Sequence, residues 1–243
     1  MNDRNPNSNA NKGFLNKIVK PKIVKICIYL SLCLFLIGLL IGVIVAAVFG
    51  PEGYNIIDNY ISDLGSFRYT PAPFILDSIA MITAFLLVPI FLYSYKNLIS
   101  GIKKVVFNSN NSLSRRIFNA FISFNIFLGL VCLIIAVVGL FGVGLFSEDR
   151  STELGLHYIF SIIVFGGLAT GALFNGLAIL LRKSIYPRLL GLYMLIVPPT
   201  VAILFVFPPP MVTLPFLEWM MLFGAFLWLI PEALIILRKL RKE

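Results

Sequence analysis

Six apolar runs divide the chain, and each is long enough to cross a bilayer as a helix. A helix rises 1.5 Å per residue, so about 20 apolar residues span the roughly 30 Å hydrocarbon core. The chain is 59% hydrophobic and only 13% charged, whereas soluble domains carry about 25% charged residues. The sequence therefore predicts an all-α, polytopic membrane protein built as a six-transmembrane-helix bundle. The runs are Ile26–Phe49, Phe74–Tyr95, Ile117–Phe146, Leu156–Leu181, Leu189–Phe207 and Phe216–Leu237.

The polar N-terminal segment differs from the rest of the chain. Residues 1–25 are rich in Asn and Lys and offer no apolar face to bury, which is typical of a disordered, basic cytoplasmic tail. The first apolar run is too long for the core of a signal peptide and has no cleavage site behind it, so it is expected to remain as an anchor. The predicted domains are the tail, 1–25, and the transmembrane domain, 26–240.

The distribution of charge predicts the orientation. Eighteen of the 20 Lys and Arg residues lie before the first run, after the last, or in the second and fourth connections, which leaves Arg68 and Arg150 for the opposite side. Because positive residues stay in the cytoplasm, we expect a multi-pass protein of the cell membrane with both termini cytoplasmic. Most acidic residues lie in or beside the first, third and fifth connections, which would be outside.

The first outer connection carries the most strongly patterned polar segment. From Asn55 to Gly65, apolar residues fall on one side of a helical projection and polar residues on the other. This pattern predicts a short amphipathic helix on the membrane surface. A surface loop whose polar residues meet water is the alternative. If the apolar side folds over the bundle, it brings Asp63 close to the start of the fourth run.

Asp63 and His157 are the candidate catalytic residues, as an acid–base pair at the outer rim. His157 is the single histidine and opens the fourth run, and ionisable groups at the edge of a transmembrane helix usually pair or function. Glu153, His157 and Ser161 follow at i, i+4 and i+8, a spacing that would place them on one helical face. A carboxylate, an imidazole and a hydroxyl in a row are typical of an activated nucleophile. For Glu153 and Ser161 a solvated first turn or helix capping is the favoured alternative. Candidate binding residues are Asp58, Ser62, Asp77, Glu153, Ser161 and Glu218.

Several classes of site have no support in the sequence. With one histidine and no paired ligand spacing, no metal site is predicted, and without nucleotide-binding glycine motifs no cofactor is expected. The basic residues are expected to meet anionic lipid rather than nucleic acid. Membrane lipids are the expected partners, and a protein partner stays open. Asn125 and Asn175 lie at matched depth on consecutive runs and are expected to share a direct or water-bridged hydrogen bond.

A resemblance rests on the first outer connection. Asn59-Tyr60-Ile61-Ser62-Asp63-Leu64-Gly65 follows the first transmembrane run, a Pro-containing spacer leads to Phe74, and His157 lies near the start of the fourth run. This arrangement resembles the six-helix membrane family catalogued as domain of unknown function 998. It is similar, more distantly, to the DRAM/Sfk type of six-helix proteins, which carry a related Ile-Ser-Asp motif. The resemblance implies a fold and a membrane location but no reaction.

Three functions remain open from the sequence. The first is an outward-facing polar pocket around Asp63 and His157 that binds or modifies a lipid or lipid-like ligand. The second is a small transporter, and the third is a non-catalytic membrane scaffold or assembly factor. Whether the chain is an enzyme is left open at this stage.

Overall fold

Six long helices form the structure, a computed structural model that describes residues 17–100, 102 and 112–242. They are α2 (Pro21–Phe49), α3 (Phe74–Ile99), α5 (Leu113–Leu145), α6 (Leu156–Leu181), α7 (Arg188–Val206) and α8 (Leu214–Leu240). All six are long and apolar enough to cross a membrane. The predicted all-helical, six-span bundle is therefore confirmed.

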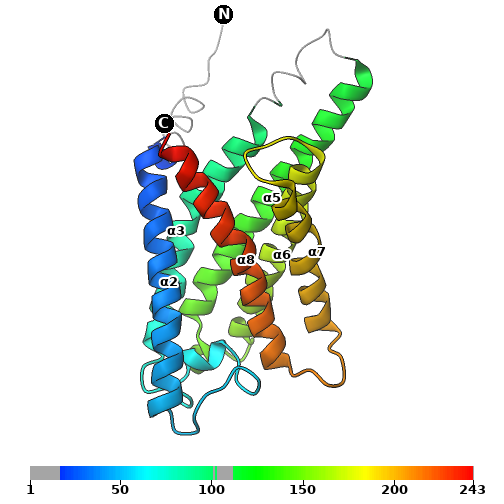
Figure 1. Ribbon diagram of the computed structural model, residues 1–243. Coiled ribbons are helices and arrows are strands. Elements are labelled where there is room, and N and C mark those ends of the chain that lie inside the picture. Colours follow the sequence, from blue (N-terminus) through cyan, green and yellow to red (C-terminus); the bar gives the residue numbers. More distant parts are fainter. Residues whose placement is uncertain (1–16, 101, 103–111, 243) are drawn as a thin grey trace, which may run out of the picture.

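Consecutive helices pack side by side, and the last returns to the first. Contacts join α2 to α3, α3 to α5, α5 to α6, α6 to α7 and α7 to α8, and α8 also touches α2. Figure 1 shows α8 running obliquely from the side of α7 to the start of α2. The outward faces of the helices are apolar and exposed, as for Leu40 and Ile203, which suits contact with lipid rather than water. The helices thus surround a shared interior.

The two ends of the bundle carry different charge. The acidic end holds the connections 50–73, 146–155 and 207–213, and the basic end holds the connection 182–187 with the end of α3 and the start of α5, the start of α2 and the end of α8 (Figure 1). The α2 helix begins at Pro21, so it includes the last residues of the predicted tail. Residues 1–16 of that tail lie outside the described part of the chain.

Small residues allow α5 and α6 to pack closely. A Cβ added at Gly139 would lie 2.5 Å from the Val164 nitrogen, and one at Gly167 would lie 2.8 Å from the Cys132 carbonyl oxygen. Backbones can approach this closely only where side chains are absent. The Asn175 amide lies against Gly129, while the Asn125 Nδ2 donates to the Phe121 carbonyl at 2.9 Å. The two amides therefore face the same interface but make no direct hydrogen bond.

The first connection folds differently from the predicted amphipathic helix. Its only helical part is η1 (Ser62–Gly65), a single 3-10 turn, and a separate turn precedes it. Asn55 Oδ1 accepts hydrogen bonds from the Ile57 and Asp58 backbone nitrogens at 2.9 and 3.0 Å. Such side chain–backbone bonds offer the chain an alternative to helical hydrogen bonding. The continuous helix over 55–65 is thus not confirmed, because its polar side chains bond to the backbone.

Candidate functional site

The first connection folds back over the acidic end and docks on α8. The Ile61 backbone nitrogen donates to Glu218 Oε2 at 2.6 Å, and the Trp219 Nε1 donates to the Asn59 carbonyl at 3.1 Å. Ile61 and Leu64 are buried against α2, α3 and α8, whereas Ile57 stays exposed. The apolar residues therefore cover the bundle as the sequence predicted, although only the second half of the segment takes part.

Asp63 holds this docked segment in shape. Its carboxylate accepts from the Tyr60 backbone nitrogen at 2.9 Å and from Asn59 Nδ2 at 3.3 Å, and the residue is 3% exposed. Burial raises the pKa of Asp63, while these two hydrogen bonds oppose the shift. The main role of the Asp63 carboxyl group is thus to cap the turn that contains Ser62.

Glu148, in the short helix η2 (Glu148–Arg150), lies beside Asp63. Desolvation of its carboxyl group raises the pKa of Glu148 to about 7, and the neighbouring charge of Asp63 adds to the rise. Two carboxyl groups this close share a proton more easily than they carry two charges. The pair joins the first and third connections.

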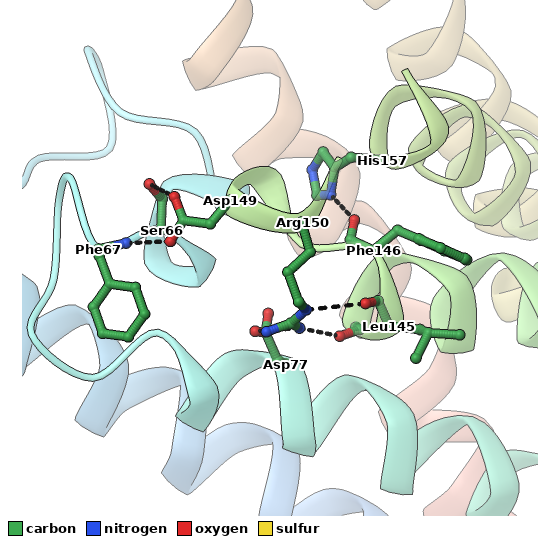
Figure 2. Close-up of polar contacts among 9 residues, drawn as sticks. Ser66, Phe67, Asp77, Leu145, Phe146, Asp149, Arg150 and His157 are labelled. Atoms are coloured by element: carbon green, nitrogen blue, oxygen red, sulfur yellow. Dashed lines mark hydrogen bonds and ion pairs between the residues drawn. The ribbon is translucent and has the colours of Figure 1, made fainter. Parts of the chain in front are cut away.

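The other residues of the third connection complete the link between the two loops (Figure 2). Asp149 accepts from the Ser66 hydroxyl at 2.7 Å and from the Phe67 backbone nitrogen at 2.6 Å. Arg150 forms an ion pair with Asp77 at 2.7 Å and donates to the Gly144 and Leu145 carbonyls. Because the last carbonyls of a helix lack partners within it, a cation there stabilises the end of α5.

His157 lies at the start of α6, close to the same loop. Its Nδ1 is 2.8 Å from the Phe146 carbonyl oxygen, a contact that ties α6 to the end of α5 (Figure 2). Among the described residues no hydrogen bond joins His157 to Asp63, although the Asp63 charge is near enough to act on the imidazole. The predicted pair is thus placed in one region without direct contact.

The proposed row of Glu153, His157 and Ser161 does not form. Glu153 is exposed in a turn before α6, because Gly155 takes a left-handed conformation (φ 65°) and the helix begins at Leu156. The Ser161 hydroxyl donates to the His157 carbonyl oxygen at 2.9 Å rather than to the imidazole. This arrangement gives no activated nucleophile, since a serine nucleophile needs its base within hydrogen-bond reach.

The remaining predicted residues have separate surroundings. Asp58 is exposed and accepts from Asn55 Nδ2 at 3.0 Å. Asp77 and Glu218 are buried at the acidic end with the partners given above. Sequence analysis missed the roles of Glu148, Asp149 and Arg150. The only signal was their position in an outer connection, and periodicity cannot say which loop contacts which.

A narrow apolar cavity of about 140 Å³ opens beneath these loops. It is lined by side chains of α2, α3, α5, α6 and α8, and the polar residues at its acidic end are Ser62, Ser161 and Glu218. Glu232 lines the opposite end. Glu218 and Glu232 are fourteen residues apart on α8, about 21 Å along a helix at 1.5 Å per residue.

Glu232 is a buried carboxyl group that sequence analysis did not single out. It accepts from the Ser94 hydroxyl, which in turn lies 2.9 Å from the Tyr186 hydroxyl. Glu232 and Tyr186 are 5% and 3% exposed. The three side chains come from α8, α3 and the connection between α6 and α7, so they pin that connection to the bundle.

The described residues contain no group of three or more His, Cys, Asp or Glu side chains that could hold a metal ion. Residues 24–207 match the family model described as Frag1/DRAM/Sfk1/Cwh43P N-terminal domain. The chain belongs to this family. No curated protein and no solved structure gives a significant match. Membership in the Frag1/DRAM/Sfk1/Cwh43P family confirms the predicted relationship to the DRAM/Sfk type, whereas the resemblance to domain of unknown function 998 stays a prediction.

Proposed function

We propose that this integral membrane protein binds a single-chain lipid or the acyl chain of a larger lipid in the cavity. The observation that carries the proposal is an almost wholly apolar channel, lined by five helices and ending at a polar mouth. Ligand sites are typically apolar cavities with a few placed polar groups. The channel is narrow and about four helical turns long, which fits one extended chain better than a ring system.

The residues at the polar mouth indicate the chemistry of the ligand's polar end. Ser62, Ser161 and Glu218 line it, and Asp63, Glu148 and Asp149 lie in the loops around it. Carboxyl groups disfavour an anionic head, whereas hydroxyl groups of a ligand can donate to them. The preferred ligand therefore has a neutral, hydroxyl-bearing or cationic polar end. Asp63 and His157 act as positioning residues, since each holds a segment that forms the mouth.

The chain of the ligand enters from the bilayer, between α2 and α8. Phe35 and Phe226 line the cavity from these two helices, and their rings meet edge to face with centroids 5.6 Å apart. Aromatic side chains in contact can separate by rotation about their side-chain bonds without changing the backbone. The contact between these two rings is the proposed entry for the acyl chain.

The test compares two lipids that share one acyl chain but differ in head charge. Purified protein would be incubated with monooleoylglycerol or with oleate, and bound lipid measured by native mass spectrometry. We expect one monooleoylglycerol per chain and at least about tenfold weaker retention of oleate, because the mouth is acidic. Equal retention of both would contradict the proposed head-group preference.

A matched pair of variants tests the cavity itself. Ala225→Leu adds the same bulk to the cavity wall that Ala47→Leu adds to the exposed surface of α2. Ala225→Leu should reduce monooleoylglycerol retention at least about fivefold, since a narrow cavity cannot absorb three extra carbons. Ala47→Leu should leave it unchanged. Equal loss in both variants would show that the lipid binds the outer surface instead.

A further inference from the structure

A second cavity lies at the basic end, apart from the apolar channel. It has a volume of about 230 Å³ and lies where α3 and α6 end beside the first half of α5. Its polar lining is Asn97, Ser100, Arg182, Lys183 and Ser184, and Leu98, Ile122 and Ile126 are among its apolar residues. We call this cavity the basic pocket. None of its described lining residues is acidic.

Arg182 lies across the end of α3. Its two terminal nitrogens are 3.4 Å from the Ser100 carbonyl oxygen, and one of them is also 3.4 Å from the Leu98 carbonyl oxygen. These contacts are at the long end of the range for hydrogen bonds. They orient the guanidinium group but leave much of its hydrogen-bonding capacity unused. Lys183 makes no hydrogen bond or ion pair with the described residues.

The side-chain amide of Asn97 carries a hydrogen-bond donor that has no acceptor among the described residues. Its Oδ1 accepts from Lys239 Nζ at 2.6 Å, and because an ammonium group only donates, this contact fixes which side of the amide holds the oxygen. The Nδ2 on the other side is buried and has no hydrogen-bond partner among the described residues. A buried donor without a partner costs free energy, unless a ligand accepts from it.

From these observations we propose that the basic pocket binds a phosphate group, carried by an anionic phospholipid of the adjacent leaflet. Arg182 and Lys183 supply charge, and Asn97 Nδ2 supplies a fixed donor. Phosphate oxygens accept several charge-assisted hydrogen bonds at once. Basic pockets between transmembrane helices are suited to anionic lipid head groups. The apolar residues Ile122 and Ile126 continue the pocket toward the bundle and favour a lipid over a free ion.

The first experiment uses the whole chain in nanodiscs of phosphatidylcholine, with or without phosphatidic acid, followed by native mass spectrometry of retained lipid. Phosphatidic acid is chosen because its head group is a bare phosphate. We expect one retained phosphatidic acid per chain and at least about tenfold weaker retention in Arg182→Gln. Retention of phosphatidylcholine alone would overturn the proposal.

Two controls separate the pocket from general attraction and from misfolding. Arg188→Gln removes the same charge from an exposed position at the same end that does not line the pocket, and it should leave retention within about twofold. Asn97→Ala keeps every charge but removes the buried donor, and it should weaken retention about fivefold. Equal losses in Arg182→Gln and Arg188→Gln, or no loss in Asn97→Ala, would overturn the proposal.

A competition arm distinguishes the two sources of phosphate. Inorganic phosphate is titrated into the nanodiscs that hold phosphatidic acid. Unchanged retention supports a lipid ligand, because the acyl chains and glycerol then contribute to binding. Displacement of the lipid by inorganic phosphate would overturn the lipid assignment. The apolar channel and the lipid proposed for it lie outside this pocket. Failure of either proposal therefore does not contradict the other.

Discussion

The acidic and basic ends of the same bundle are closed in different ways. At the acidic end, side chains tie the connections to each other and to the helices: Asp149 accepts from Phe67 in another connection, Glu218 of α8 accepts from Ile61, and Arg150 pairs with Asp77 of α3. At the basic end, Arg182 makes only long contacts, and Lys183 has no partner among the described residues. The acidic end is thus held together by bonds within the protein, whereas the basic end keeps cations and a donor available for a ligand.

The largest expected effect concerns the two buried carboxyl groups of α8. Glu218 accepts from a backbone nitrogen, which can only donate, whereas the hydroxyl partners of Glu232 can turn to bond to each other. Glu218→Ala should therefore cost about 2–3 kcal/mol, because it leaves the Ile61 N–H buried without a partner. Glu232→Ala should cost less. Thermal unfolding in detergent would measure both.

Glu218→Gln is the matched control, since it keeps an oxygen that can accept from Ile61. It should cost about 1 kcal/mol or less, and hydrogen exchange at residues 59–66 should stay slow. If the alanine and glutamine variants were equally destabilised, the Ile61 contact would not be what holds the loop to α8.

The helices could be predicted from the sequence, whereas the contacts between loops could not. The apolar run Leu156–Leu181 has the same bounds as helix α6. Such runs predict helices well because, in lipid, the polar groups of the backbone must form their hydrogen bonds within the helix. The sequence predicted that Asp63 and His157 lie in one region, because the apolar residues beside Asp63 were expected to pack on the end of the bundle. The pairing of Glu148 with Asp63 depends on how two loops meet, and no spacing within one segment encodes it. Glu153 was misplaced because the i, i+4 spacing was extended to a residue before the helix: α6 begins at Leu156, after Gly155 takes a left-handed conformation.

The second prediction compares two arginines, one at each end. Arg150 makes short bonds to Asp77 and the Gly144 carbonyl, at 2.7 and 2.8 Å, whereas Arg182 contacts carbonyls at 3.4 Å. Arg150→Gln should therefore destabilise the fold by about 2 kcal/mol, and Arg182→Gln by about half as much. Chemical unfolding in mixed micelles would measure both.

A double-mutant cycle with Asp77→Asn isolates the ion pair from the carbonyl contacts of Arg150. The coupling should be about 1 kcal/mol, because Asp77 is buried while half of the Arg150 side chain is exposed to solvent. A coupling near zero would mean that Arg150 acts only by capping α5.

The smallest expected effect is a pH dependence confined to the acidic end. Glu148 has a pKa of about 7 in the folded chain, raised from 4.5 by desolvation and by Asp63, whose pKa is raised as well. The folded state therefore binds a proton that the unfolded state has already lost above pH 4.5. Its stabilising contribution is complete below pH 4.5 and is lost as the pH rises through 7.

The carboxyl group of Glu148 is half-buried beside Asp63, but the residue as a whole is exposed, so solvent screening limits this contribution to about 1 kcal/mol. Hydrogen exchange at residues 59–66, corrected for its intrinsic pH dependence, should show more frequent opening at pH 8 than at pH 6. Glu148→Gln should reduce the difference, because an amide cannot ionise, and Glu153→Gln should preserve it, since Glu153 is an exposed residue of a separate turn. A pH dependence of unchanged size in Glu148→Gln would move its origin away from the carboxyl pair. No matching change is expected in the basic pocket, which is lined by Arg182 and Lys183 and by no acidic residue among those described.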